Sequence, residues 1–318
     1  MSTRRAFCVG LRTEGRVAGR KRIDIIVNPA AGGRRNGLFD AVLRALHDGG
    51  AFVRCLDTEY PGHATELAAM AAAEGRADVI VAAGGDGTIN EVARGLMATG
   101  VPLGLLPLGT ANVLAIEAGQ TLDARSVADT LLYGEAKLIG TGLVNDALFL
   151  LMVGIGFDGV VVSNIEPLQK RRFGKLAFIW EGLKHWIKGP GASLKVEING
   201  RSDEQLHGIA WVVVTNARHY AGPFVLSRTT DVTRPGLDVF LFHAGSRLAF
   251  ALYFLGLAVG VVEAMPWVTR VRAGTLRVWE SGASPGAVRV EVDGDAVGSC
   301  PVSIQAGEKI LRLIVPRR

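Results

Sequence analysis

The chain has 318 residues, enough for one large or two ordinary domains, and its 49% hydrophobic and 20% charged residues are typical of a folded protein rather than a disordered one. Its net charge of +5 belongs mostly to residues 1–22, which hold seven Lys or Arg and a single Glu, so the remainder is close to neutral. A nucleic-acid-binding protein needs basic residues clustered on a folded face, and this distribution gives no support for such a partner.

The first half of the chain alternates strands with helices. After a basic extension over residues 1–21, apolar runs typical of strands occur at 23–27, 51–56, 78–83 and 103–106. Helical patterns lie at 36–47, 64–74 and 89–97, and a further helix is expected from about residue 111. This alternation predicts a parallel sheet with helices on both faces, in an α/β domain over residues 22–136.

The pattern changes after about residue 136. The Asn145-Asp146 and Asn199-Gly200 pairs are typical of hairpin turns. Helices are predicted at 173–186 and 248–262, and strands at 137–144, 147–153, 194–198, 208–215, 237–242, 268–279, 287–292 and 309–315. We therefore predict an antiparallel, β-sandwich-like domain over residues 137–318, whose last strand can pack back on the first domain.

The longest apolar run is Leu248–Val262, shorter than the roughly 20 residues that span a bilayer. It indicates a buried helix or an interfacial one. The N-terminus is charged but has no apolar stretch of the kind found in secretory signals. Cysteines at positions 8, 55 and 300 lie far apart, which argues against a disulfide framework or zinc site and indicates a reducing compartment such as the cytoplasm.

Three glycine-containing turns follow predicted strands of the first domain, at residues 28–33, 84–88 and 107–112. In an open α/β sheet, ligands bind beyond the carboxyl ends of the strands, so all three turns are expected at one edge. Glycine lets phosphate oxygens approach backbone N–H groups, and a following helix adds free N–H groups and a positive dipole end. The turns therefore predict a phosphate-binding edge.

The polar residues of these turns allow two interpretations each. Asp86 would repel phosphate if isolated, so it binds a cation, a hydroxyl or backbone N–H groups, or it only holds the turn. Thr88 is predicted as a helix N-cap, with Glu91 as its capping-box partner. Thr110 is either a phosphate contact or another N-cap. Asn28 and Pro29 form either a ligand contact or a simple turn.

These motifs together resemble the diacylglycerol kinase catalytic-domain family, which includes bacterial lipid kinases, sphingosine kinases and ceramide kinases. The resemblance is carried in order by Val27-Asn28-Pro29 with Gly32, by GGDGT at 84–88 extended by Ile-Asn-Glu, and by PLGTAN at 107–112. Segments of the second half agree, at 154–158, 173–176, 236–239 and 293–295. GGDGT alone is weak, since NAD kinases and phosphofructokinases carry similar loops, but the three motifs in order are specific.

The resemblance implies a two-domain, ATP-dependent lipid kinase with a Rossmann-like (phosphofructokinase-like) first domain and catalysis between the domains. The general base implied by the family's late Asp-Gly-Glu motif corresponds here to Asp293-Gly294-Asp295, with Asp295 in the glutamate position and Asp293 able to share or take the role. Asp86 is expected to position the triphosphate. The residues implied to contact ATP are Asn28, Pro29, Ala30, Ala31, Gly32, Thr58, Gly84, Gly85, Asp86, Gly87, Thr88, Ile89, Asn90 and Thr110.

One loop departs from the family pattern. Bacterial members carry an accessory magnesium site in a loop that usually reads Asp-Gly-Leu, whereas this chain reads Pro235-Gly236-Leu237. Since a hard cation needs oxygen ligands, this metal is either missing or bound by Asp231 instead. Mg²⁺ bound to the ATP itself is expected in either case.

Two other kinase signatures are absent from the sequence: there is no GxxxxGK[ST] loop and no HRD loop. Two alternatives to a lipid kinase stay open, an NAD-kinase-like small-molecule kinase and a non-catalytic nucleotide or lipid sensor. The lipid acceptor could be diacylglycerol-like or a sphingoid base, and the oligomeric state is not determined. The apolar run at 248–262 is expected either to contact a membrane or to be a core helix. The basic residues Arg171, Arg172 and Lys175 are expected either to contact lipid headgroups or to form a solvated face.

Overall fold

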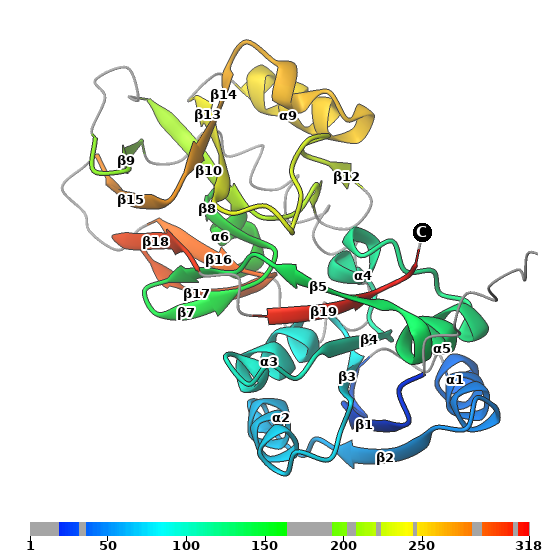
Figure 1. Cartoon of the computed structure of the whole chain (residues 1–318). Coiled ribbons are helices and arrows are strands. Elements are labelled where there is room, and N and C mark those ends of the chain that lie inside the picture. Colours follow the sequence, from blue (N-terminus) through cyan, green and yellow to red (C-terminus); the bar gives the residue numbers. More distant parts are fainter. Residues whose placement is uncertain are drawn as a thin grey trace, which may run out of the picture.

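The computed structural model describes residues 19–31, 36–163, 193–201, 208–220, 224–243, 247–281, 288–307 and 311–317. These residues form a six-stranded sheet with helices on both faces and a larger antiparallel sheet with its own core (Figure 1). The α/β fold with an antiparallel second half is as predicted. No helix among the described residues is long and apolar enough to cross a membrane.

The six-stranded sheet has the order β2-β1-β3-β4-β19-β5. Strands β1 to β4 and β19 run parallel, and β5 pairs antiparallel with β19. Its strands are β1 (Arg22–Val27), β2 (Phe52–Asp57), β3 (Val79–Gly84), β4 (Leu103–Pro107), β5 (Glu135–Ile139) and β19 (Leu311–Val315). The last strand of the chain therefore lies inside the sheet that the first strands build.

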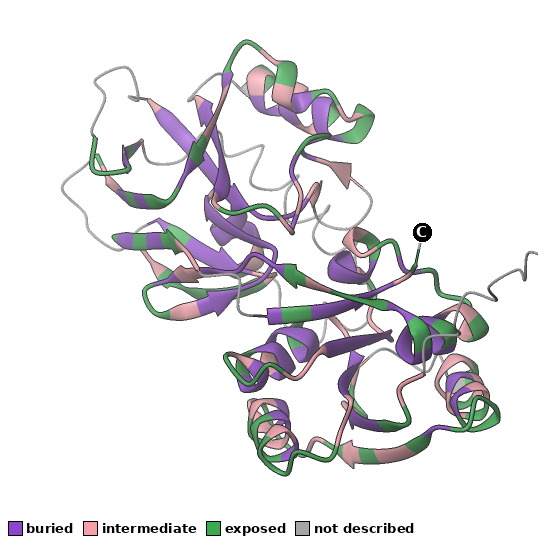
Figure 2. Ribbon diagram, viewed as in Figure 1, coloured by how far each residue is buried: buried purple, intermediate pink, exposed green. Residues whose placement is uncertain are grey.

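Helices cover both faces of this sheet and bury their apolar sides against it (Figure 2). On one face Ala68 and Val92 pack on Ile80, and on the other Leu46 and Leu131 pack with neighbouring strand residues. The first face is covered by α2 (His63–Ala73), α3 (Asp86–Leu96) and α4 (Val113–Glu117), and the second by α1 (Asn36–Asp48) and α5 (Ala124–Tyr133).

The described strands of the second sheet pair antiparallel in the order β17-β16-β8-β10-β9-β15-β18-β6-β7, with β13 joining β10 and β14. A short β11 (His219–Tyr220) pairs with β12 (Phe224–Val225) outside it. The strand bounds are β6 (Gly142–Val144), β7 (Ala147–Phe149), β8 (Met152–Gly156), β9 (Leu194–Ile198), β10 (Ile209–Thr215), β13 (Leu237–His243), β14 (Val268–Ala273), β15 (Thr275–Glu280), β16 (Arg289–Val292), β17 (Asp295–Ser299) and β18 (Val302–Ala306). Its core is rich in β-branched residues, as expected for strands.

Helices α6 (Phe157–Ser163), α9 (Arg247–Val259) and the 3₁₀ turn η1 (Val262–Ala264) accompany this sheet. Phe250, Tyr253 and Leu257 of α9 are buried against Trp211 and Phe242 of the sheet. The opposite side of α9 is exposed, so the apolar run at 248–262 is in part a core helix and in part a surface. The helix predicted at 173–186 lies outside the described residues.

Three predicted strands are each two strands. The run 137–144 divides at Gly140-Thr141, where the chain leaves β5 for β6 in the other sheet. The run 147–153 divides into β7 and β8, and 268–279 divides at Gly274 into β14 and β15. An apolar run shows that residues are buried but does not show where the chain changes partner, which is why the divisions were missed.

Candidate active site

The three glycine-containing corners lie at one edge of the six-stranded sheet, as the sequence predicted. They follow β1, β3 and β4, which are adjacent and parallel, so their carboxyl ends meet. The N–H of Asn28 donates to Ala83 O at 3.0 Å, and the N–H of Leu108 donates to Gly84 O at 2.9 Å. Thr58 follows β2 at the same edge, where its N–H donates to Val27 O.

The corners touch one another closely enough to require glycine. A Cβ on Gly109 would lie 2.5 Å from the Cα of Gly85, because the two backbones pass in contact. A Cβ on Gly84 would lie 2.4 Å from the Thr88 hydroxyl oxygen. Asn28 Nδ2 donates to that same hydroxyl at 3.1 Å and thereby joins the first corner to the second. These contacts fix the shape of the edge.

Helix α3 begins earlier than predicted, and this changes the role of Thr88. The N-cap is Gly85, which has no side chain to cap with, and Thr88 is already inside the helix. Glu91 instead accepts a hydrogen bond from the N–H of Ala64 at 3.2 Å on α2. The predicted capping box is therefore wrong, and the free N–H groups and positive end of α3 open toward the glycine corners.

Asp86 faces the start of α4. Its Oδ1 accepts from the N–H of Leu114 at 3.4 Å. Burial raises the pKa of Asp86, and the hydrogen bond from Leu114 partly offsets this rise. Of the interpretations left open by the sequence, the structure shows a bond to backbone N–H groups, which ties α3 to α4 across the corner.

Asn112 caps α4 from the left-handed region, with φ of 51°. Its Nδ2 donates to Gly109 O at 2.8 Å. Its Oδ1 is buried and has no hydrogen-bond partner within the part of the chain that the structure describes. Thr110 is exposed and is not the cap. The sequence prediction omitted Asn112, although it ends the PLGTAN motif.

The other residues implied to contact ATP have different surroundings. Ala30 and Ala31 turn back on Asn28, whose Oδ1 and backbone O accept their N–H groups at 3.0 Å. Pro29 is exposed at the corner, and Gly32 lies outside the described residues. The side chain of Ile89 is buried in the core and does not face the edge. Of the residues implied to contact ATP, the structure therefore brings mainly backbone groups, rather than side chains, together at this edge.

Asp293 holds the two halves of the chain together. It sits with φ of 50° at the turn between β16 and β17. Its Oδ1 accepts from the N–H groups of Leu151 and Met152, both at 2.9 Å. Its Oδ2 accepts from Leu150 N–H at 2.8 Å and from Asn90 Nδ2 at 2.6 Å, and Asn90 is on α3. Burial raises the pKa of Asp293, and these four bonds oppose the rise.

The same turn brings Asp295 to the glycine edge. Asp295 is exposed at the start of β17, and a Cβ on Gly87 would lie 3.8 Å from its Oδ2. A residue of the late Asp-Gly-Asp motif therefore lies beside the GGDGT corner, although more than 200 residues separate them. Asn90 and Asp293 form the hydrogen bond that sets this approach.

Two buried carboxyl groups lie behind this turn. Asp158 Oδ2 and Glu291 Oε1 lie 2.5 and 2.8 Å from the position of a Cβ on Gly154. Glu291 Oε2 accepts from the N–H of Gly294, and Asp158 accepts from Trp211 Nε1 at 2.9 Å and from the Tyr220 hydroxyl. Burial raises the pKa of Asp158 to about 6 and the pKa of Glu291 well above its usual value. The sequence analysis quoted Asp158 only as part of a motif and did not consider Glu291.

Asp231 lies apart from the glycine edge, in the loop before β13. Its Oδ1 accepts from the N–H and the hydroxyl of Thr233, both at 2.8 Å. Partial burial raises its pKa, but the bonds from Thr233 and nearby Arg218 and Arg234 outweigh this, so the net pKa is lowered. Among the described residues, no group of three or more His, Cys, Asp or Glu side chains is arranged to hold a metal ion.

Comparison with known proteins gives matches over both halves. Residues 22–144 match the diacylglycerol kinase catalytic domain model, and residues 151–315 match the YegS C-terminal NAD kinase beta sandwich-like domain model. A probable lipid kinase YegS-like from Pseudomonas putida is 33% identical over 275 residues, covering 85% of this chain and 88% of that protein. A diacylglycerol kinase from Mycobacterium tuberculosis is 25% identical over 304 residues, covering 93% and 96%.

A solved structure shares the fold. The crystal structure of a putative diacylglycerol kinase from Bacillus anthracis superimposes with a TM-score of 0.77 at 21% identity. The match covers 96% of this chain and 98% of that one. Both sheets are therefore part of a known two-sheet architecture.

Proposed function

Because the chain belongs to the diacylglycerol kinase catalytic domain family and is a lipid kinase, a phosphotransferase, we propose that it transfers the γ-phosphoryl group of ATP to a hydroxyl group of a lipid. The observation that carries this proposal is the position of Asp295 beside Gly87, where a carboxylate from the second sheet meets the glycine edge of the first. A phosphate donor at that edge and an acceptor near Asp295 would be adjacent.

The glycine edge is the proposed ATP site. The triphosphate lies against the backbone of Asn28 and of Gly84 to Thr88, at the positive end of α3, with Thr58 and Thr110 at its borders. Mg²⁺ bound to the triphosphate would neutralise the charge of the transferred group.

Asp295 is the proposed general base. A base must take a proton from the acceptor hydroxyl, so it needs a carboxylate oxygen that faces the reacting groups. Asp293 has both oxygens engaged by four hydrogen bonds, whereas Asp295 is exposed at the glycine edge. We assign Asp293 to positioning and Asp295 to the proton transfer, while Asp86 positions the triphosphate through the α3–α4 contact.

In this proposal residues 22–136 bind the nucleotide and residues 137–318 bind the lipid. The acceptor is a diacylglycerol-like lipid or a sphingoid base, both of which present a hydroxyl at the bilayer surface. Positioning and electrostatics supply most of the catalysis in such reactions, so the lipid has to be held with its hydroxyl between Asp295 and the triphosphate.

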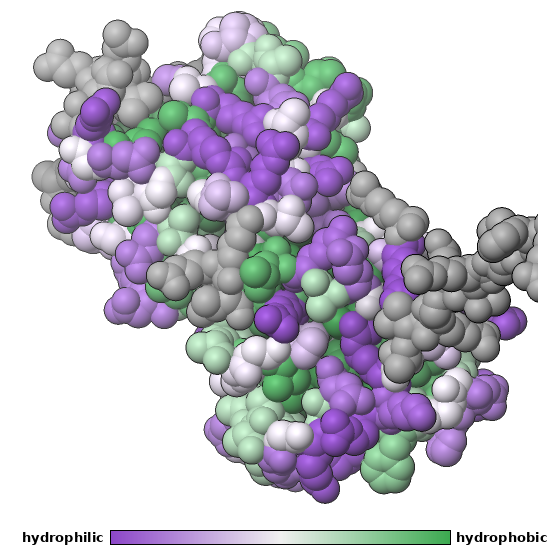
Figure 3. Space-filling view, in the orientation of Figure 1, coloured by the Kyte–Doolittle hydropathy of each residue, from purple (hydrophilic) through white to green (hydrophobic). Residues whose placement is uncertain are grey.

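A membrane surface is proposed at α9. Residues 248–259 contain no charged side chain, and Leu248, Leu255 and Val259 are 68%, 59% and 58% exposed. Trp267, 47% exposed, follows close by. Apolar side chains are visible over α9 in the upper part of Figure 3. Leu, Val and Trp at the surface are typical of helices that enter the headgroup region, so we propose peripheral contact with the membrane that holds the acceptor.

Labelled ATP and a panel of acceptors test the reaction. The panel holds diacylglycerol, a sphingoid base and ceramide in mixed vesicles, with NAD as a small-molecule acceptor. We expect label in one lipid product, dependence on Mg²⁺, and none in NAD. Label in NAD alone would contradict the lipid proposal. ATP binding by calorimetry with no product from a total lipid extract would contradict the kinase reaction.

A further inference from the structure

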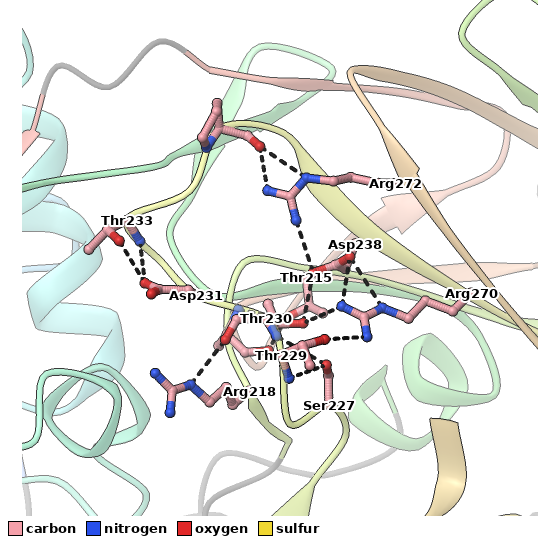
Figure 4. Close-up of polar contacts among 12 residues, drawn as sticks. Thr215, Arg218, Ser227, Thr229, Thr230, Asp231, Thr233, Asp238, Arg270 and Arg272 are labelled. Atoms are coloured by element: carbon pink, nitrogen blue, oxygen red, sulfur yellow. Dashed lines mark hydrogen bonds and ion pairs between the residues drawn. The ribbon is translucent and has the colours of Figure 1, made fainter. Parts of the chain in front are cut away.

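The loop between β12 (Phe224–Val225) and β13 holds the position where the family resemblance implies an accessory magnesium ion (Figure 4). The oxygen donors available there are the Asp231 carboxylate, the Pro235 carbonyl and the Asp238 carboxylate. Asp231 and Pro235 belong to the loop itself, and Asp238 follows on β13. Whether a cation fits depends on what these oxygens already bind.

Two arginines of β14 reach these oxygens because of strand register. Asp238 lies directly opposite Arg272 in the β13–β14 pair, and Arg270 lies opposite Phe240. Residues two apart on a strand share a face, so both guanidinium groups lie on the same side as Asp238. Arg270 also passes over the Phe240 ring, 5.5 Å from its centre.

The carboxylate of Asp238 is buried, 3% exposed, and is saturated by these contacts. Arg270 Nη2 lies 3.1 Å from Oδ1, and Arg272 Nη1 lies 3.4 Å from Oδ2. The hydroxyl of Thr230 donates to Oδ2 at 2.7 Å. Two positive charges therefore offset one buried negative charge, with one of them shared with Glu263 through Arg270 Nη1 at 2.9 Å.

The other candidate ligands are engaged as well. The Pro235 carbonyl accepts from Arg272 Nε at 3.1 Å and also from Nη2 of the same side chain. Asp231 Oδ1 binds Thr233. A divalent cation would have to displace guanidinium groups and would be repelled by those that stayed, so the donor set does not fit the ion.

We propose that Arg270 and Arg272 take the place of the accessory metal ion, so that this loop is held by built-in cations and needs no divalent ion. Arginine suits this role because its planar group stays charged and donates several hydrogen bonds in a fixed fork. The inference concerns the loop alone and does not depend on the nucleotide or the acceptor.

The order of this loop affects stability, because the loop contacts the point where the chain passes between the sheets. The Val232 carbonyl accepts from Gly140 N–H at 2.6 Å, and the Val232 side chain is buried in the core of the first sheet. Arg218 Nε donates to Thr230 O at 3.0 Å, which fixes the loop from the other side. An ordered loop therefore stabilises the connection between the two halves.

Thermal unfolding without nucleotide tests the proposal. Wild-type protein is measured in EDTA and in millimolar MgCl₂ or CaCl₂, beside Arg272→Met and the control Arg277→Met, an exposed arginine on β15. We expect no metal effect on wild-type or control Tm. Arg272→Met should lose a few degrees in EDTA, since one of the two cations beside the buried Asp238 carboxylate is removed, and should regain part of it with metal. A wild-type Tm that rises several degrees with metal would overturn the proposal.

A binding measurement covers the case in which Arg272→Met does not fold. Mn²⁺ is titrated into nucleotide-free wild-type protein and followed by its spin resonance, with Asp231→Asn alongside. We expect wild-type protein and Asp231→Asn to show the same Mn²⁺ binding. One Mn²⁺ bound per wild-type chain and lost in Asp231→Asn would place a metal in the loop and contradict the proposal.

Discussion

At the scale of single residues, Asp293 and Asp295 share one turn but differ in their surroundings. Asp293 accepts four hydrogen bonds from residues of β8, the turn before it and α3, whereas Asp295 is exposed at the glycine edge. A carboxylate that is fully used by N–H donors holds structure together, and one that faces a reacting group can exchange a proton. Substitution of Asp293 should therefore mainly lower stability, whereas substitution of Asp295 should mainly lower activity.

We expect Asp295→Asn to lower kcat by about 10²–10⁴-fold, because an amide cannot take the proton of the acceptor hydroxyl, while its exposed position keeps the change in Tm small. Asp293→Asn places an NH₂ group against N–H donors and leaves some of them unsatisfied, so Tm should fall by roughly 5 °C or more. Kinetics with a lipid acceptor and thermal unfolding measure both. Normal kcat in Asp295→Asn, together with inactive but stable Asp293→Asn, would reverse the assignment.

The second residue-scale prediction concerns Asp158 and Glu291, whose pKa values are raised by burial, Asp158 to about 6. Tyr220, Trp211, Asp293 and Asp295 are the other groups that act on them. A carboxyl group with a raised pKa in the folded state binds its proton more tightly there than when unfolded. Its stabilising contribution is therefore full below about pH 4 and is lost as pH rises, for Asp158 up to about pH 6 and for Glu291 higher.

Glu291→Gln keeps an acceptor for Gly294 N–H and stays neutral at every pH. Its Tm relative to wild type should therefore rise steadily between pH 5 and pH 8, because unfolded wild-type protein releases the proton that the folded carboxyl retains. Glu197→Gln on β9 is the control, for which we expect parallel curves. Parallel curves for Glu291→Gln as well would show that folding does not raise the pKa of Glu291.

At the scale of elements, the turn after β4 and the start of α3 are coupled by backbone contact. Gly109 and Gly85 approach so closely that a single methyl group at position 109 would strike main chain rather than a movable side chain. Main chain at this edge is also the proposed phosphate site. A substitution that disturbs the packing of Gly109 against Gly85 should therefore weaken nucleotide binding.

Gly109→Ala should raise the KM for ATP about 10-fold or more, as expected for an overpacking cost of about 1–3 kcal/mol at the binding edge. The control is Gly37→Ala on α1, where a Cβ meets nothing within 4 Å and KM should not change. Initial rates measured at varied ATP concentrations give the KM of each variant. Equal KM values in the two variants would show that the glycine edge is not the nucleotide site.

At the scale of the whole molecule, the acceptor is a lipid and the α9 surface is apolar. Leu255→Glu adds a charge to the exposed side of α9 without touching its buried side. We expect vesicle binding to fall about 10-fold, because inserting a charge among apolar residues at the interface is unfavourable, while the KM for ATP is unchanged. Co-sedimentation with vesicles measures the binding.

The control for this variant is Phe52→Glu, which charges an exposed apolar residue on β2, in the other half of the chain. It should bind vesicles like wild type. Equal loss in both variants would mean that binding reflects general charge rather than α9. Unchanged binding in Leu255→Glu would remove α9 as the membrane surface.

The sequence by itself determined the alternation of strands and helices, the α/β class and the gathering of three glycine corners at one edge. These follow from local patterns, because parallel neighbouring strands must end together. It placed the start of α3 three residues late and predicted a Thr88 cap, since GGDGT reads as a turn and the helix begins within it.

Only the tertiary structure decided the features that depend on pairing between distant segments. Leu311–Val315 lies between β4 and β5, Asp293 reaches Asn90, and Arg270 and Arg272 reach Asp238. The contacts of Arg270 and Arg272 depend on strand register, because a shift of one residue would turn every side chain to the opposite face, and the other two features depend on strand order and on how the two sheets pack. Residue patterns record which side chains are polar or apolar, and the choice of partner is made when the whole chain packs.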